Sequence, residues 1–214
     1  MYFKTPLVSE MRKIYGRPKL EQVMAASKHQ EKNVFIVKRH PFKRLLSGFT
    51  DKILHSIKNS PHDRMSRKIL EKYRGLPKRK YKHKETVPTF SEFIKYVMDN
   101  YEKNQEIDMH WAPVVDFCSV CDVEYTHVLD FEKLTTEFER MLPGLNKTFQ
   151  NLKIGEVRKN VNVQNPTTSP FIQKNLQSLK PEIYERLCKL YEKDFTVFGY
   201  KLPSFEEIKN GYVL

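Results

Sequence analysis

The clearest pattern of hydrophobic and polar positions lies between residues 33 and 53. Asn33 to Val37 (NVFIV) is a short apolar run rich in β-formers, which predicts a buried strand of a parallel sheet. Pro41 then suits the first turn of a helix, because a missing N–H does no harm there. The apolar residues that follow recur at helical spacing and form one stripe: Phe42, Leu45, Leu46, Phe49 and Ile53. The segment therefore predicts a strand that leads directly into a core-facing helix.

Further along, helical and strand patterns continue to alternate. Residues 124–129 (EYTHVL) alternate as a second strand should, and Trp111 to Cys121 predicts a packed loop or short helix. Further helices are expected at residues 19–30, from Thr89 or Ser91 to Tyr101, from Asp130 to Pro143-Gly144, and at 181–195. This order indicates an α/β protein with a mostly parallel sheet flanked by helices. We expect one domain over residues 1–214.

The charge balance is strongly basic. The 214 residues include 38 Lys and Arg against 26 Asp and Glu, a formal net charge of +12, which favours a polyanionic partner. No run approaches the roughly 18 apolar residues of a membrane helix, and no apolar core of a secretory signal is visible. We therefore expect no membrane span in this chain. No RNP, helix-turn-helix or zinc-finger pattern occurs, so nucleic acid is not an expected partner.

Positive charge is concentrated in a basic loop or insertion at residues 58–88. Between Arg64 and Lys84, ten of 21 residues are Lys or Arg. Two interpretations stay open, a solvated helix followed by a basic loop and a surface that binds a polyanion. In the second, Lys78, Arg79 and Lys80 are the candidate contacts.

Cys118 and Cys121 form a single CxxC motif (CSVC), which suits a redox pair, half a zinc site or a local disulfide. No second CxxC or HxxxH completes a zinc set, and we expect no metal. No βαβ pattern follows in the thioredoxin manner, which leaves a local disulfide or two packed thiols. Asn146 begins an acceptable N-glycosylation sequon, Asn-Lys-Thr.

Arg39 occupies the junction between the first strand and its helix. Ligands of parallel sheets collect outside the carboxyl ends of the strands, and the start of a helix favours phosphate. The planar guanidinium of Arg39 suits bidentate contact with phosphate oxygens. The hydroxyl of Ser47, two turns into the helix and off the apolar stripe, could meet the same anion. A purely structural junction remains the alternative.

Four segments resemble the Golgi carbohydrate sulfotransferases, and most closely the chondroitin 4-O-sulfotransferase and HNK-1 sulfotransferase group. The first matches the family's 3′-phosphate-binding motif, Arg-(Asp/Glu)-Pro-Phe-x-Arg-Leu-x-Ser, at Arg39, Pro41, Phe42, Arg44, Leu45 and Ser47, with a basic residue following at Lys52. The others are His110-Trp111 before the CxxC motif, residues 125–134 (YTHVLDFEKL) and residues 190–200 (LYEKDFTVFGY). Four segments in order are a specific match.

The chain also departs from the family pattern. His40 stands where the family has an acidic residue, and Leu129-Asp130 replaces Gly-Lys. No Gly-Cys-Thr-type 5′-phosphosulfate loop precedes Asn33, so residues 1–32 are an atypical N-terminal segment. The resemblance implies a P-loop-like sulfotransferase fold, and we expect its first strand, its sulfate-holding loop and its membrane anchor to lie outside this chain.

The resemblance implies a function as well. Members of the family that it resembles transfer sulfate from 3′-phosphoadenosine 5′-phosphosulfate (PAPS) to a glycan hydroxyl in the Golgi, without a metal. Arg39 and Ser47 would hold the 3′-phosphate, with Lys52 as a weaker candidate. The basic segment would attract a chondroitin-like glycosaminoglycan. The alternative is a catalytically inactive relative that binds polyanions.

A sulfotransferase needs a base for the acceptor hydroxyl, and His110 is the first candidate, because an imidazole titrates near neutral pH. Asp108 is close enough in sequence to orient it. Glu132 is the alternative carboxylate. A simple structural role for His110 beside Trp111, as a hydrogen-bonded histidine of the core, remains open.

Overall fold

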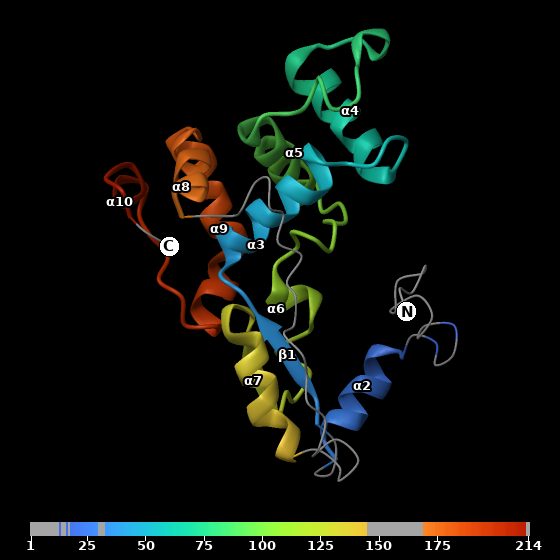
Figure 1. Ribbon diagram of the computed structural model, residues 1–214, viewed down its shortest axis with the longest axis vertical. Coiled ribbons are helices and arrows are strands. Elements are labelled where there is room, and N and C mark those ends of the chain that lie inside the picture. Colours follow the sequence, from blue (N-terminus) through green and yellow to red (C-terminus); the bar gives the residue numbers. More distant parts are fainter. Residues whose placement is uncertain (1–12, 14–15, 17, 30–32, 145–168, 213–214) are drawn as a thin grey trace.

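The computed structural model describes residues 13, 16, 18–29, 33–144 and 169–212. Within them, strands β1 (Phe35–Lys38) and β2 (His127–Asp130) pair in parallel, with Ile36 opposite Val128. The predicted α/β fold with a parallel sheet is thereby confirmed, although β2 begins three residues later than the alternation predicted. Because the strands are parallel, both end at the same edge of the sheet, and Arg39 directly follows the last residue of β1. Figure 1 shows β1 leading into α3 at this edge.

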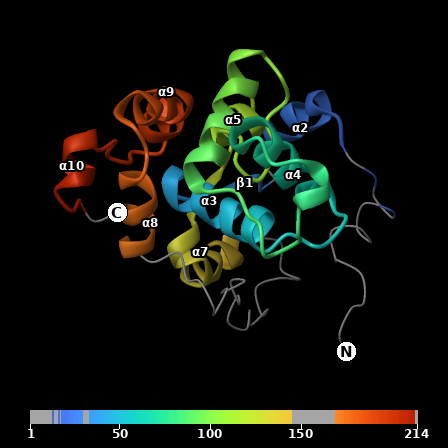
Figure 2. The same ribbon diagram turned by 90° about the horizontal axis from the view of Figure 1, so that it is seen from above.

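Helices surround this small sheet. In the described residues they are α2 (Leu20–Ser27), α3 (Pro41–Gly48), α4 (Pro61–Arg74), α5 (Phe90–Glu102), α6 (Val114–Phe117), α7 (Leu134–Met141), α8 (Ser169–Gln177), α9 (Pro181–Val197) and α10 (Phe205–Lys209). Helices α8, α9 and α10 gather on one side of α3, and α4 lies at the opposite end of the long axis from α2 and α7 (Figures 1 and 2). The sequence patterns did not predict α8 or α10.

The core is centred on α3 and on the π-helix that continues it, Phe49–Leu54. The predicted apolar stripe is confirmed, because its five residues are at most 2% exposed: Phe42, Leu45, Leu46, Phe49 and Ile53. The ring centroid of Phe42 lies 5.0 Å from that of Phe195 on α9. The centroid of Phe49 lies 5.1 Å from that of Phe93 on α5. Burial on both sides fixes α3, and with it the polar residues around the helix.

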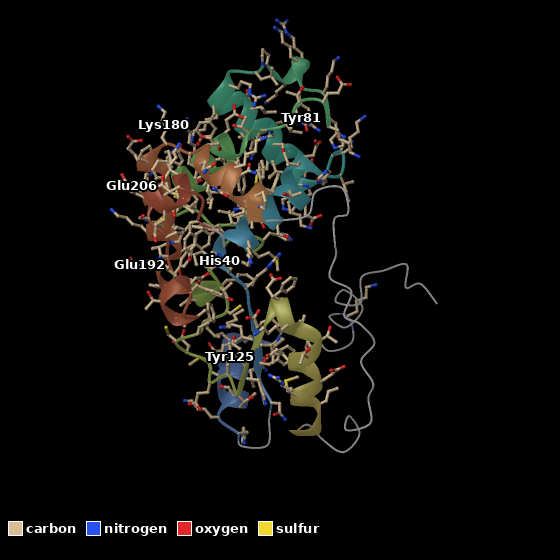
Figure 3. The ribbon with its side chains drawn as sticks, turned by 60° about the vertical axis from the view of Figure 1, so that its left-hand side comes forward. His40, Tyr81, Tyr125, Lys180, Glu192 and Glu206 are labelled. Atoms are coloured by element: carbon tan, nitrogen blue, oxygen red, sulfur yellow. The ribbon has the colours of Figure 1, made fainter. Side chains whose placement is uncertain are left out.

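The basic segment folds as helix α4 followed by a 3₁₀ turn, Lys78–Lys80. Asp63 on α4 is fully buried and accepts hydrogen bonds of 2.5 Å from the Tyr81 hydroxyl and from Nη2 of Arg67. This contact ties the connection after α4 back to the helix. Figure 3 shows Tyr81 at this end of the molecule, well separated from His40. The predicted helix is confirmed, and the three basic residues of the 3₁₀ turn are exposed.

No helix in the described part of the chain combines the length and the apolar character needed to cross a membrane.

Candidate active site

Arg39 connects the end of β1 to α3, as predicted. Its guanidinium carbon lies 4.4 Å from the ring centroid of Phe131, and its Nε donates to Oε1 of Glu132 at 3.4 Å. The side chain is 18% exposed, and this burial lowers the pKa of Arg39, with Glu132 opposing the shift. Among the described residues, no hydrogen bond engages the two terminal nitrogens. The fork that would grip a phosphate therefore remains available to a ligand.

Ser47 is half-buried on α3, and no described residue hydrogen-bonds its hydroxyl. Six residues of helix separate it from Pro41, a rise of about 9 Å. Arg39 therefore lies just before the start of α3 and Ser47 near its end, no hydrogen bond between these two described residues is present, and their grip on one anion stays a prediction. Lys52, the third candidate, pairs with Asp51 through an Nζ–Oδ2 distance of 2.8 Å.

The second arginine of the motif, Arg44, has a structural role. Its Nη1 donates to the carbonyl oxygen of Ala112 at 2.5 Å and its Nη2 to that of Met109 at 2.6 Å. Gly48 also allows α3 to approach this loop closely, because it has no side chain. A Cβ at this position would lie only 3.1 Å from the carbonyl oxygen of His110. The motif thus holds the loop at residues 109–112 against α3.

His40 caps α3. Its Nδ1 accepts a hydrogen bond from the backbone N–H of Phe42 at 3.2 Å. The centroid of its ring lies 5.3 Å from the ring centroid of Phe195 and 5.1 Å from that of Tyr200. Burial lowers the pKa of His40 to about 4, and the charge of Lys43 adds to this effect. A neutral imidazole is therefore the capping acceptor at the position where the family motif has an acidic residue.

We expect the protein to become less stable as the pH falls from about 6.5 to about 4. The folded state has the lowered His40 pKa of about 4, whereas an unfolded chain keeps a value of about 6.5. Between these values the unfolded state binds more protons, so acid favours unfolding, by roughly 3 kcal/mol at most. Urea unfolding at pH 7 and pH 4.5 measures the effect. His40→Asn keeps a capping acceptor, so a variant with the pH dependence of the wild type would contradict this assignment.

His110 is held by Asp108, which lies two positions earlier in the sequence. Oδ1 of Asp108 lies 2.5 Å from Nδ1 of His110 and accepts the His110 backbone N–H at 2.9 Å. The other carboxylate oxygen, Oδ2, lies 3.0 Å from Nε2 of His62 on α4. Partial burial would raise the pKa of Asp108, but the hydrogen bonds from His110 and His62 outweigh it and lower this pKa. The carboxylate stays ionised and fixes the plane of the His110 ring.

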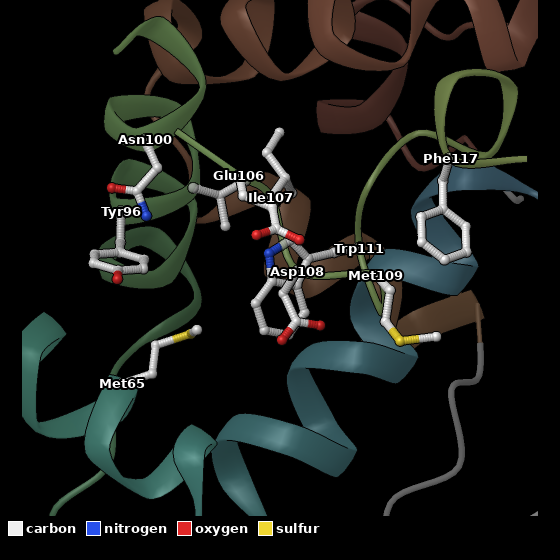
Figure 4. Close-up of a pocket in the computed structure, with 10 residues that line it drawn as sticks. Met65, Tyr96, Asn100, Glu106, Ile107, Asp108, Met109, Trp111 and Phe117 are labelled. Atoms are coloured by element: carbon white, nitrogen blue, oxygen red, sulfur yellow. The ribbon is translucent and has the colours of Figure 1, made fainter. Parts of the chain in front are cut away.

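A cavity of about 800 Å³ is lined by Asp108 and by its loop neighbours Met109 and Trp111 (Figure 4). Asp108 and Trp111 from the loop face Tyr96 and Asn100 from α5 across it, with Glu106 at the loop's start. Carboxylates, an amide and aromatic rings are groups that bind the hydroxyls and the apolar faces of a sugar. The sequence indicated only the loop residues Asp108, His110 and Trp111 in this region, because residues from α4 and α5 reach it only in the folded chain.

The alternative base Glu132 and the two cysteines of the CxxC motif lie in different environments from His110. Glu132, the alternative base, lies against Arg39 and partly neutralises its charge. Cys118 and Cys121 are free thiols in the structure, and burial raises the pKa of Cys118, so their pairing stays a prediction. Asn146 lies outside the described residues.

The four segments that carry the resemblance contact one another. Asp194 on α9 is buried and accepts the backbone N–H groups of Val114 and Val115, each at 2.8 Å. The hydroxyl of Tyr191, also on α9, donates to the carbonyl oxygen of Trp111 at 2.5 Å. Helix α9 therefore holds one side of the His110 loop while Arg44 holds the other. The role of Asp194 was not predicted, because its only signal in the sequence is an acid within an apolar helical stripe.

The described residues thus combine an α/β fold with a basic strand–helix junction and a histidine–carboxylate pair. Comparison with known families assigns the chain to a class of protein. Residues 2–201 match the model of the sulfotransferase family, and the chain belongs to this family. The resemblance found in the sequence is thereby confirmed.

The curated relatives are carbohydrate sulfotransferases. Carbohydrate sulfotransferase 11 of Rattus norvegicus is 27% identical over 172 residues, 80% of this chain and 47% of that protein. Carbohydrate sulfotransferase 10 of Xenopus laevis is 28% identical over 210 residues, covering 89% and 54%. Carbohydrate sulfotransferase 8 of Mus musculus is 31% identical over 170 residues, covering 77% and 39%. The chain spans about half the length of the curated relatives it matches, and no solved structure matches it.

Proposed function

We propose that this chain carries the 3′-phosphate site and the catalytic base of a PAPS-dependent carbohydrate sulfotransferase. The observation that carries the proposal is the guanidinium of Arg39 at the carboxyl end of β1, with terminal nitrogens that no described residue engages. Family membership gives this cation a ligand of suitable chemistry, the 3′-phosphate of PAPS. Ser47, and more weakly Lys52, would contact the same nucleotide. These contacts orient the donor rather than break a bond.

The transfer step uses His110. The acceptor hydroxyl oxygen forms a bond to sulfur while the bond from sulfur to the 5′-phosphate oxygen breaks. The hydroxyl proton passes to His110, and adenosine 3′,5′-bisphosphate leaves. Asp108 holds Nδ1 of His110, so that Nε2 is the nitrogen that accepts the proton. The cavity beside the pair is the proposed acceptor site.

The acceptor that we propose is an acidic, chondroitin-like glycosaminoglycan modified in the Golgi. The exposed side chains of Lys78, Arg79 and Lys80 would attract its carboxylates and sulfates, and salt would weaken that attraction. The relatives' names support a carbohydrate acceptor, and the basic segment supports an acidic one.

A second candidate is an inactive relative that binds polyanions. The observation that favours it is the exposed basic 3₁₀ turn Lys78–Lys80, which can attract a polyanion without any transfer chemistry. Such a protein would bind the nucleotide product or a glycan and transfer no sulfate.

Nucleotide binding tests the proposal. We expect Arg39→Ala to weaken the binding of adenosine 3′,5′-bisphosphate by about 10- to 100-fold, because hydrogen bonds to a charged group contribute roughly 1.5–3 kcal/mol. Isothermal titration calorimetry measures the dissociation constant. Arg140→Ala is the matched control, since Arg140 is 75% exposed on α7, and it should bind as the wild type does.

A transfer assay with labelled PAPS and chondroitin separates the two candidates. Sulfate incorporation by the wild type supports the enzyme, and nucleotide binding without incorporation supports the inactive relative. A wild-type chain that binds no nucleotide would contradict the proposed 3′-phosphate site.

A further inference from the structure

Three potential metal ligands meet where α4 approaches the loop at residues 108–110. His62 comes from the first turn of α4, and Asp108 and His110 come from the loop. One ligand atom of each lies within 4.8 Å of the other two. The two imidazole centroids are 5.2 Å apart, and both rings face the same carboxylate. Sequence reasoning expected no metal because it considered only cysteine spacing, whereas 46 positions separate His62 from Asp108.

The donor set suits a particular class of ion. Two imidazole nitrogens and one carboxylate oxygen are ligands of zinc and of neighbouring divalent transition metals. Such an ion lies about 2.0–2.2 Å from each ligand atom, which places tetrahedral ligands about 3.4 Å apart. Asp108 is already 3.0 Å from Nε2 of His62 and 2.5 Å from Nδ1 of His110. Small side-chain shifts would therefore accommodate an ion, and water would supply the fourth ligand.

The surroundings hold the ligands in place and still admit an ion. Arg44 fixes the loop through the carbonyl oxygens of Met109 and Ala112. The hydroxyl of Ser66 donates to the carbonyl oxygen of His62 at 3.0 Å and braces the first turn of α4. The three ligand side chains are 18%, 24% and 35% exposed for His62, Asp108 and His110. A preorganised but accessible site of this kind loses little freedom when an ion binds.

We propose that His62, Asp108 and His110 form a binding site for one divalent transition-metal ion of the zinc type. The ion links α4 to the loop that carries His110. The ion takes the place of the proton between Asp108 and Nδ1 of His110. That proton moves to Nε2, which gives the other neutral tautomer, so Nε2 can no longer accept the proton of the acceptor hydroxyl. This last consequence rests on the proposed function, whereas the binding of the ion does not.

Titration of the metal-stripped full chain tests the site without any activity measurement. Zn²⁺ binding is followed by calorimetry, and Co²⁺ binding by its visible absorption, which reports tetrahedral coordination. We expect one equivalent to bind. His62→Gln keeps a hydrogen-bond donor toward Asp108 and should lower the affinity at least about 10-fold. His29→Gln is the control, since His29 is exposed and outside the site, and its affinity should be unchanged.

Three results would overturn the proposal: no saturable binding to the wild type, more than one equivalent of equal affinity, or full affinity in His62→Gln. Melting temperatures without metal establish whether each variant folds. Should His62→Gln fail to fold, Asp108→Asn replaces it, with the same expected loss of affinity. Nucleotide binding is measured on the same samples, so failure of the metal site and failure of the 3′-phosphate site are separate outcomes.

Discussion

Replacing His110 with alanine is expected to lower the turnover number of sulfate transfer at least about 100-fold. A positioned general base contributes about 10²- to 10⁴-fold to a rate. The imidazole of His110 lies 2.5 Å from the carboxylate of Asp108, which lines the cavity. The side chain is 35% exposed, so its removal should leave the fold intact. The affinity for adenosine 3′,5′-bisphosphate should stay within about twofold of the wild type, because Arg39 and Ser47 are untouched.

The measurement is steady-state transfer of labelled sulfate, with nucleotide affinity determined in parallel. His29→Ala, an exposed histidine outside the site, is the matched control and should transfer as the wild type does. An unchanged turnover number in His110→Ala would remove His110 from the mechanism and direct attention to Glu132. A parallel loss of nucleotide affinity would indicate that the substitution had disturbed α3 instead.

Asp194→Ala is expected to lower the free energy of unfolding by about 4 kcal/mol. The carboxylate is 1% exposed and accepts the backbone N–H groups of Val114 and Val115. Hydrogen bonds to a charged group contribute roughly 1.5–3 kcal/mol each, and alanine would leave both buried donors without a partner. Because these donors begin α6, the loop that carries His110 should loosen as well.

Chemical denaturation of three variants measures this effect. Asp194→Asn keeps one acceptor oxygen and should lose about half as much stability as Asp194→Ala. Glu192→Ala, two residues earlier on the exposed face of α9 (Figure 3), should stay within about 0.5 kcal/mol of the wild type. Equal losses in Asp194→Ala and Glu192→Ala would show that the buried carboxylate has no special role.

Local patterns predicted most of the described elements because they depend on neighbours in sequence. The stripe from Phe42 to Ile53 repeats with the period of a helix, and its burial is confirmed. Thr89 was one of two candidate caps for α5, and its hydroxyl accepts the Glu92 N–H at 3.2 Å while the Glu92 carboxylate accepts the Thr89 N–H. Helices α8 and α10 were not predicted, because each is short and has few apolar residues. These residues form a buried surface only when α8 packs against α3 and α10 packs against α9.

The sequence by itself determined the family and the candidate site residues Arg39 and Ser47, because motif residues stand at fixed spacings along one strand–helix unit. A separate motif, His110-Trp111, supplied the candidate base. Tertiary structure decided which of the motif residues bind other parts of the protein. It assigned Arg44 to two loop carbonyls, His40 to a neutral cap and Asp194 to the start of α6. It also brought His62 to Asp108 across 46 positions. Such contacts depend on how helices pack, and packing joins residues whose separation in sequence carries no periodic signal.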